Sequence, residues 1–217
     1  CARKDFLQLF NDYKRSKKVL KYNQATNKDL VVPLYRSIGG LPFTFGPLQS
    51  MFGGHKRMVN SVAVSADDTF LVSGGEDTTL RVWHSTSGNC ELVLEDHSDE
   101  VNCVAISKDM KVLLSGSKDK SVKIWERKTG KVIMTLFDHR QSVTCLAVSP
   151  TGPFFVSGSK DCTAVVWVLN PGGKGSTGDR MYIIPHQYPV HSVCFSFEGN
   201  VIFTGSGREP VKEEENN

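Results

Sequence analysis

The sequence contains no long hydrophobic run. None of its 217 residues lies in a stretch that approaches the roughly 18 consecutive apolar residues needed for a membrane-spanning helix. The first residues, CARKDFLQLF, also lack the apolar core and the small-residue cleavage site of a secretory signal. These absences predict a protein that neither spans a membrane nor carries an address to one.

The cysteines form no pattern typical of a metal site or a redox motif. There are six of them, none in a CxxC pair, and the chain has no N-x-S/T glycosylation acceptor. Both absences favour a reducing compartment, so we expect free thiols in a cytoplasmic protein, with the nucleus as the alternative. The cysteines are Cys1, Cys90, Cys103, Cys145, Cys162 and Cys194.

Net charge is also small, because 26 Lys and Arg oppose 23 Asp and Glu and leave +3. So small an excess gives no argument for nucleic-acid binding. The charge is uneven, however: residues 1–36 hold nine Lys or Arg against three Asp, whereas the final residues lean acidic. We therefore divide the chain into a basic N-terminal segment (1–46), a middle region (47–207) and an acidic tail (208–217).

The basic segment has two interpretations. Phe6, Leu9, Phe10, Tyr13 and Leu20 fall at helical spacing among lysines and arginines. This spacing indicates either a basic amphipathic helix or an ordinary connecting helix with a solvated charged face. The stretch LVVPLYRSIGGLPFTFGP that follows is expected to be an extended linker or a poor strand, because its Pro and Gly interrupt any regular pattern.

The middle region contains a strong internal repeat. Three segments superpose at a period of 42 residues without a gap, beginning at His55, His97 and His139. Each consists of short apolar stretches separated by turn residues, as in VTCLAVS, FFVSGS and TAVVWVL, and a further strand precedes each His. A fourth copy begins at His186, displaced to 47 residues, and then breaks off.

This repeat resembles the WD40 repeat family, in which units of about 40–45 residues each form one four-stranded propeller blade. The resemblance implies an all-β fold: a WD40 β-propeller segment with three complete blades and partial blades over residues 47–207. Propellers close with about four to eight blades. Either residues 1–46 supply a degenerate blade or the remaining blades lie outside this sequence, and we favour the second interpretation.

Four polar or aromatic positions recur in each copy at offsets of 0, 18, 22 and 28 residues. In the family, these residues form a hydrogen-bonded relay from a buried Trp through Ser and His to Asp. Such side chains tolerate burial only when each has a partner, so the relay is expected to rigidify its blade. The fourth copy cannot complete the relay, because Arg208 and Glu214 occupy its last two positions after His186 and Thr204. The relay residues are His55, Ser73, Asp77 and Trp83; His97, Ser115, Asp119 and Trp125; and His139, Ser157, Asp161 and Trp167.

Ser, His and Asp are also the components of a hydrolytic triad. Their recurrence argues against that function, since an active site is needed once. The stretch GGKGSTG from Gly172 lacks the leading Gly and the Ser or Thr of a phosphate-binding loop, and it reads as a flexible turn. His186 and His191 lack a Cys or carboxylate at ligand spacing. The sequence therefore predicts no enzyme, no metal site and no cofactor.

Function is then expected on the surface. In WD40 proteins the usual contact face is formed by the loop that bears the His and the turn that bears the Asp. Lys118, Arg140 and Lys160 are expected to form one positive patch there, suited to an acidic or phosphorylated peptide. The candidate partner-binding residues are Lys56, Arg57, Glu76, Asp99, Lys118, Arg140, Lys160 and Tyr188.

These features predict a non-catalytic scaffold module that binds proteins or peptides in an intracellular multiprotein assembly, with neither membrane nor nucleic acid as a partner. Two alternatives stay open. One is a regulatory sensor propeller fused to an upstream effector, as in proteins resembling the NACHT-type ATPase and WD40 fusions. The other is an RNA- or ribosome-associated WD40 protein that uses the basic segment.

Overall fold

The computed structural model describes residues 30–34, 50–169 and 178–208, and within these ranges it contains strands and no helix. The strands pair into three four-stranded antiparallel sheets and two two-stranded sheets. The expected all-β fold and its consecutive four-stranded units are therefore confirmed.

Each complete sheet is a meander in which consecutive strands are neighbours. The first contains β3 (Val59–Val64), β4 (Phe70–Gly75), β5 (Thr79–His84) and β6 (Cys90–Glu95); the second contains β7 (Val101–Ile106), β8 (Val112–Ser117), β9 (Val122–Glu126) and β10 (Val132–Leu136); and the third contains β11 (Val143–Val148), β12 (Phe154–Ser159), β13 (Thr163–Val168) and β14 (Arg180–Pro185). The fourth copy contributes only β15 (Val190–Phe195) and β16 (Ile202–Ser206).

The fifth sheet favours one of the two expectations for the segment before the repeats, a strand over an extended linker. Residues Leu30–Leu34, expected as linker or poor strand, form strand β1, which pairs with β2 (Ser50–His55) just before the first repeat. Pro33 lies inside β1, a position compatible with an edge strand, where one side of the backbone needs no partner. The expected N-terminal helix, the GGKGSTG turn up to residue 177 and the acidic tail from residue 209 lie outside the described residues.

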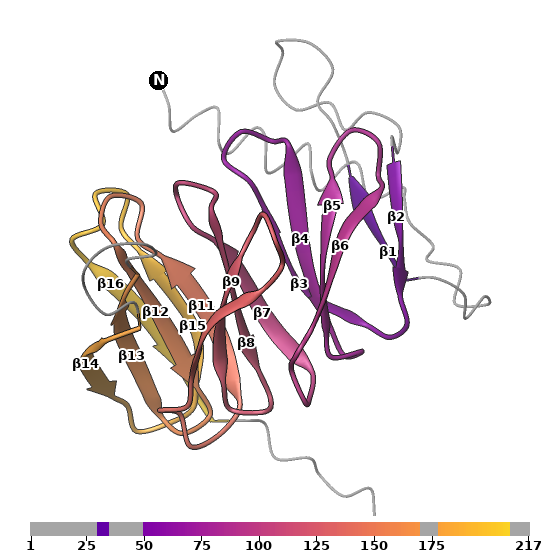
Figure 1. Cartoon of the computed structure of the whole chain (residues 1–217). Helices are drawn as coiled ribbons and strands as arrows, with labels where there is room; N and C mark the ends of the chain where they lie inside the picture. The colour runs from indigo at the N-terminus through magenta and orange to yellow at the C-terminus, as the bar shows by residue number, and fades with distance from the viewer. Residues whose placement is uncertain (1–29, 35–49, 170–177, 209–217) are drawn as a thin grey trace, which may run out of the picture.

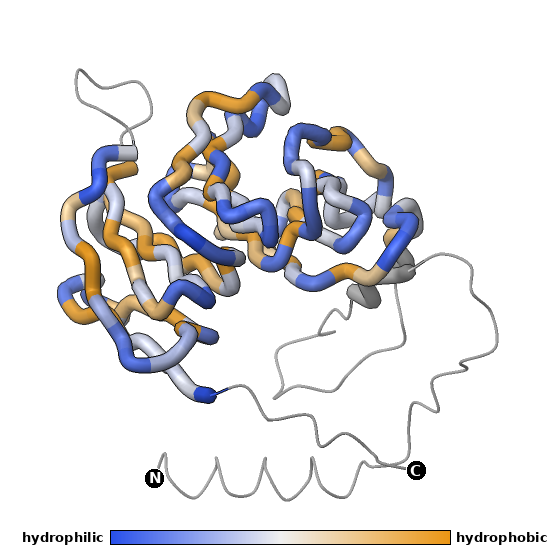
Figure 2. Tube along the Cα trace, turned by 90° about the horizontal axis from the view of Figure 1, so that it is seen from below, coloured by the Kyte–Doolittle hydropathy of each residue, from blue (hydrophilic) through white to orange (hydrophobic). Residues whose placement is uncertain are grey.

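The sheets stand side by side in chain order, from β1 and β2 at one end to β15 and β16 at the other (Figure 1). The first strands β3, β7, β11 and β15 each pack against the next one along the row. Hydrophobic stretches lie within the sheets, and many connecting turns are hydrophilic (Figure 2). This arrangement buries the second strand of each four-stranded sheet, and all six residues of β4 and of β8 are buried.

Three glycines permit the close approach of neighbouring sheets. A Cβ placed on Gly74 would lie 2.6 Å from Cγ1 of Val101 in the next sheet. At Gly116 the same atom would lie 2.5 Å from Val143 Cγ1, and Gly158 faces Val190 in the same way. Such separations are shorter than van der Waals contact, so only glycine fits between these sheets.

Candidate binding face

Each complete sheet contains one chain of hydrogen bonds that joins all four of its repeat-specific residues. In the first sheet, the Trp83 indole N–H donates to Ser73 Oγ at 2.8 Å. Ser73 Oγ lies 2.6 Å from Nε2 of His55, and Nδ1 of His55 lies 2.9 Å from the Asp77 carboxylate. The second and third sheets repeat the arrangement, with Nε2–Oγ distances of 2.7 Å and Trp–Ser distances of 2.8 Å, at His97, Ser115, Asp119 and Trp125 and at His139, Ser157, Asp161 and Trp167.

The donor and acceptor types of these side chains determine where each proton lies along the chain of hydrogen bonds. Since the indole can only donate, Ser73 accepts from Trp83 and directs its own O–H to Nε2 of His55. Nδ1–H of His55 then donates to Asp77. Burial lowers the pKa of His55 below its ordinary value of 6.5, against the opposing effect of Asp77. The imidazole is therefore neutral in the folded protein at pH 7.

The carboxylate at the end of the chain is stabilised by several donors. Burial alone would raise the pKa of Asp77, but hydrogen bonds from the Lys56 backbone N–H and from the His55 and Thr79 side chains lower it below its ordinary value of 3.8. Asp77 thus caps a tight turn, and Thr78, which follows it, has a positive φ of 67°. Lys120 and Cys162 occupy the equivalent positions with φ of 74° and 65°.

These Ser, His and Asp side chains have the order of a hydrolytic triad but not its accessibility. The relay serines Ser73, Ser115 and Ser157 are 0% exposed. Each already accepts an indole N–H, so its oxygen is surrounded by protein. No substrate can reach this oxygen, and the three residues can act only as internal hydrogen-bond partners.

The relay makes folding sensitive to acid. Below about pH 6.5 the unfolded His55 binds a proton that the folded residue resists, so the free energy of unfolding falls as pH drops. A second fall follows below about pH 4, where unfolded Asp77 becomes protonated. We expect urea denaturation to show a smaller loss between about pH 7.5 and pH 5 in a His55→Gln variant than in the wild type. An equal loss in both proteins would contradict a neutral buried His55.

The loops before the first strands and the Asp turns lie at one edge of the sheets. The backbone N–H of Glu76 donates to Met58 O, that of Lys118 to Glu100 O, and that of Lys160 to Ser142 O. Each of these hydrogen bonds joins the turn that contains a relay Asp to the loop that follows a relay His. The candidate partner-binding residues therefore share one edge, and among them Lys56, Arg57, Lys118, Arg140 and Lys160 are exposed.

Lys118, one member of the expected positive patch, forms ion pairs with two carboxylates of a neighbouring loop. The Lys118 ammonium lies 3.0 Å from Glu100 and 3.7 Å from Asp99, and these carboxylates raise the pKa of Lys118. Both carboxylates belong to the loop before the first strand of the same sheet. Two loop carboxylates therefore offset the charge of Lys118, and its joint patch with Arg140 and Lys160 stays a prediction.

Two other candidate residues do come together. Lys160 and Tyr188 line an open hollow of about 520 Å³ with Gln141, Pro189 and Arg208. The Arg208 guanidinium lies 5.1 Å from the centre of the Tyr188 ring, a cation–π distance. Arg208 stands at the relay position of an Asp in the fourth copy, so nothing in the sequence indicated that it would lie in a binding hollow. Its place beside Tyr188 depends on the fold of the truncated fourth copy.

The repeats can also be compared with known families. A sequence profile described as "WD domain, G-beta repeat" matches residues 46–84, 88–126, 130–168 and 178–208, which is more than half of the chain. The chain belongs to the WD40 repeat family. Each of the first three matched WD40 repeats contains one complete hydrogen-bonded relay, and the fourth contains the β15–β16 hairpin.

Individual relatives match smaller parts. The chain is similar to "Ribosome biogenesis protein BOP1 homolog" of Monosiga brevicollis, with 36% identity over 31% of this chain and 8% of the relative. It is 41% identical to "Ribosome biogenesis protein bop1-B" of Xenopus laevis over 24% of this chain and 7% of that protein. The chain therefore covers less than a tenth of these curated relatives.

Solved structures match the fold more broadly. The structure of U3-55K superposes with a TM-score of 0.65 and 26% identity over 72% of this chain and 48% of that one. The crystal structure of RRP9 WD40 repeats gives 0.61 and 28% identity over 66% and 43%. This chain thus spans less than half of either propeller protein.

The WD40 period also marks residues that we did not single out from the sequence. Asn60 and Asn102 lie 42 residues apart, and each donates its side-chain N–H to a backbone carbonyl of the next blade, at Val101 and Val143. Thr144, at the same position of the third blade, donates to Val190 O. The glycines at blade contacts follow the same period, so the repeat alignment alone could have found both sets.

Residues 30–34, 50–169 and 178–208 hold no group of three His, Cys, Asp or Glu arranged to bind a metal ion. Five cysteines within these ranges are free, and burial raises the pKa of Cys103 and Cys145. No helix of sufficient length and apolar character to cross a membrane occurs in the part of the chain that the structure describes.

Proposed function

We propose that this WD40 segment is a non-catalytic protein-binding module that holds an acidic segment of a partner in the hollow beside Tyr188. The observation that carries the proposal is the aromatic ring of Tyr188 with Arg208 over its face and Lys160 in the same lining. An aromatic floor with cationic neighbours suits a carboxylate or phosphate attached to a peptide. The Arg can bond an oxyanion while Tyr188 packs against the peptide.

Two further observations support binding over catalysis. The recurring Ser, His and Asp side chains are hydrogen-bonded to one another inside the protein. WD40 propellers are in general non-catalytic, and they mediate protein interactions. The surface that remains for binding is formed by the exposed loops at the edge of the sheets that bears the relay His and Asp residues. The hollow at Tyr188 lies on this surface, between loops of the third and fourth blades.

The relatives suggest a setting for this module. Two relatives are named as ribosome biogenesis proteins, which favours the ribosome-associated alternative for the assembly in which this chain works. The same names favour the nucleus over the cytoplasm, so the expected cytoplasmic location gains no support from them. The regulatory sensor fused to a NACHT-type ATPase stays a hypothesis without a supporting observation.

Charge reversal at the hollow tests the binding proposal. Arg208→Glu should weaken binding of acidic and phosphorylated peptides on an array by about tenfold, since one charge-assisted hydrogen bond is lost and a repulsion is gained. Lys128→Glu is the matched control, because Lys128 is exposed in the β9–β10 turn at the opposite edge of the sheets. It should change peptide binding less than about twofold.

RNA oligonucleotides are measured in parallel on the same proteins. If they bind with steep salt dependence while no acidic peptide does, the peptide proposal is wrong and nucleic acid is the partner. Equal peptide affinities for the wild type and Arg208→Glu would likewise remove the hollow as the binding site.

A further inference from the structure

The second blade carries a row of lysines at the edge opposite the one that bears the relay His and Asp residues. Two turns lie at this opposite edge, residues 107–111 between β7 and β8 and residues 126–131 between β9 and β10. The first turn contains Lys108 and Lys111, and the second contains Lys128 and Lys131. All four residues are exposed. They form what we call the lysine row, which follows the order of the strands from β7 to β10.

Backbone hydrogen bonds hold the two turns side by side. The N–H of Arg127 donates to Lys111 O at 2.9 Å, which joins the second turn to the first. The N–H of Glu126 donates to Lys131 O at 2.8 Å, so the start of β10 lies beside the end of β9. Since neighbouring strands are about 4.8 Å apart, the row across four strands spans about 14 Å. The four lysines therefore belong to one continuous surface.

The charges of the lysine row are largely unopposed. Within the described ranges, Lys108, Lys128 and Lys131 form no ion pair. Lys111 Nζ lies 3.8 Å from the Asp109 carboxylate, and these two side chains are 78% and 48% exposed. Exposed ion pairs of this kind contribute little to stability, so Lys111 can exchange Asp109 for another anion.

Two further carboxylates are bonded within the protein. Glu126 accepts a hydrogen bond from the Thr129 hydroxyl in the same turn. Glu91 pairs with Arg127, whose guanidinium lies 4.4 Å from the centre of the Phe70 ring in the first blade. Arg127 therefore joins the first two blades, and the four lysines are the cations that remain available to a ligand.

The repeat shows that a blade does not need lysine at these positions. Forty-two residues earlier, the first blade has uncharged side chains at all four positions, namely Ala66, Thr69, Thr86 and Asn89. Its β3–β4 turn even contains two aspartates, Asp67 and Asp68. The lysine row is therefore a property of the second blade and not of the fold.

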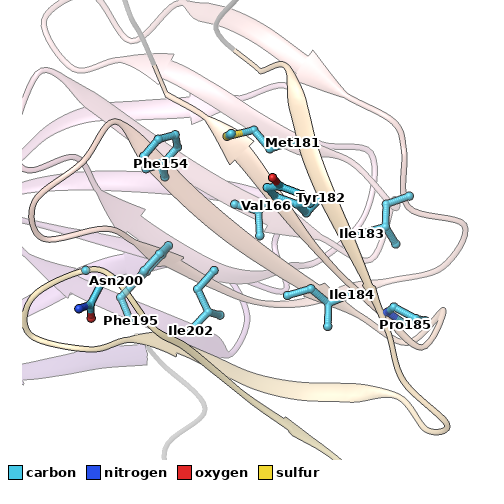
Figure 3. A pocket seen from close by; sticks show the side chains of 11 residues that line it. Phe154, Val166, Met181, Tyr182, Ile183, Ile184, Pro185, Phe195, Asn200 and Ile202 are labelled. Carbon is cyan, nitrogen blue, oxygen red and sulfur yellow. The ribbon is translucent and has the colours of Figure 1, made fainter.

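The surface on the other side of the row is uncharged. In the third blade, Pro150 and Pro153 stand at the first two of these positions. Figure 3 shows Phe154, Val166 and Phe195 in an apolar groove of about 460 Å³ between the third and fourth blades. Among the described turns at this edge, only those of the second blade contain lysine. The net charge of +3 for the whole chain does not reveal this local concentration.

We propose that the lysine row binds the phosphate backbone of a nucleic acid, a partner distinct from the acidic peptide at Tyr188. Lysine ammonium groups are point charges with several donors, and an extended row of them matches a polyanion. A duplex carries one negative charge per about 1.7 Å of its length, so about eight phosphate charges lie along a row of this span. Each of the four lysines can therefore contact a phosphate at the same time.

A polyanion suits the row better than a single carboxylate or a lipid surface. One exposed ion pair contributes little, whereas a nucleic acid releases counterions at every contact, so that several weak contacts act together. The two turns contain no aromatic residue that could stack on a base or support a peptide side chain. They also expose no large hydrophobic side chain that could enter a bilayer. The row is therefore expected to bind phosphates with little preference for sequence.

Neutralising the centre of the row tests the proposal. Lys111→Gln combined with Lys128→Gln removes two exposed charges, one from each turn, and should leave folding unaffected. Binding is measured by fluorescence anisotropy with a labelled RNA duplex of about 20 base pairs over a range of salt concentrations. The logarithm of the affinity should fall with that of the salt concentration with a slope of about −4 for the wild type and about −2 for the variant. At about 0.1 M salt the variant should bind at least about tenfold more weakly.

A control variant with the same change in charge separates the row from general attraction. Lys56→Gln combined with Arg57→Gln also removes two exposed positive charges, but at the edge that bears the relay residues. Because charges farther away than about 8 Å are largely screened at physiological salt, this variant should lose less than about threefold in affinity and keep the slope. Equal losses in the two double variants would overturn the lysine row as the binding site. Absence of duplex binding by the wild type would overturn it as well.

Other ligands and one further variant complete the test. A DNA duplex of the same length distinguishes the two sources of a phosphate backbone, and loss of binding in the row variant supports the proposal for either duplex. Phosphatidylserine vesicles that bind through the row while neither duplex binds would overturn the proposal in favour of a membrane. Arg208→Glu should change duplex binding by less than about twofold. Failure of the acidic-peptide site and failure of the lysine row therefore appear in different variants.

Discussion

Gly116→Val is expected to destabilise the protein by about 3 kcal/mol, the upper part of the range for overpacked cores. The new Cβ would lie 2.5 Å from Val143 Cγ1 and 2.7 Å from Cys103 Sγ, and further methyl groups have no space. Both neighbours are buried, so neither side chain can swing into solvent. Urea denaturation followed by tryptophan fluorescence measures the loss, because Trp125 and Trp167 lie in the adjoining clusters.

A second substitution identifies the cause. Val143→Ala removes the methyl group that faces Gly116, so the double variant should recover part of the loss and give a coupling free energy above about 1 kcal/mol. Gly207→Ala, where no atom lies within 4 Å, should stay within about 0.5 kcal/mol of the wild type. Additive effects of Gly116→Val and Val143→Ala would show that close packing between the blades is not the reason for glycine.

Ser115→Ala is expected to destabilise the protein by about 2–4 kcal/mol, because one hydroxyl serves two buried partners. The variant leaves the Trp125 N–H without an acceptor and Nε2 of His97 without a donor. Each unsatisfied buried group costs about 1–3 kcal/mol. The measurement is the free energy of unfolding in urea at neutral pH.

The control for this substitution is Ser98→Ala, which removes a hydroxyl from an exposed loop residue beside the same relay. Its effect should stay within about 0.5 kcal/mol. If Ser115→Ala costs no more than Ser98→Ala, the relay contributes nothing to stability, and the recurrence of its residues would need another explanation.

The sequence made the repeat predictable because the same local pattern recurs once in each of the three complete WD40 blades. Strands such as β12 and β13 follow directly from alternating apolar residues between turns. The offsets located His, Ser, Asp and Trp in each copy, and the resemblance to the WD40 family implied one chain of hydrogen bonds through them. The distances in all three blades agree with that order. The period of the sequence predicts a side chain's contacts where the same neighbours recur in every blade.

Features that depend on a single tertiary contact could not be predicted from the period of the sequence. Pro33 and the following glycines made β1 hard to predict, because they interrupt the strand pattern. The pairing of β1 depends on β2, nearly twenty residues later in the chain. The charge of Lys118 suggested a patch, but its side chain reaches Glu100 in the adjacent loop. Arg208 broke a repeat position and lies over Tyr188 only because the fourth blade folds as a hairpin.

The side chains that link one inner strand to the next have a consequence for local opening. Asn60 bonds to the second blade, Asn102 to the third and Thr144 to the fourth, always in the same direction along the row. Each blade is therefore coupled to its immediate neighbours, as in a one-dimensional array. Fluctuations that expose backbone amides to exchange with solvent should begin at the outer blades and reach the second blade last.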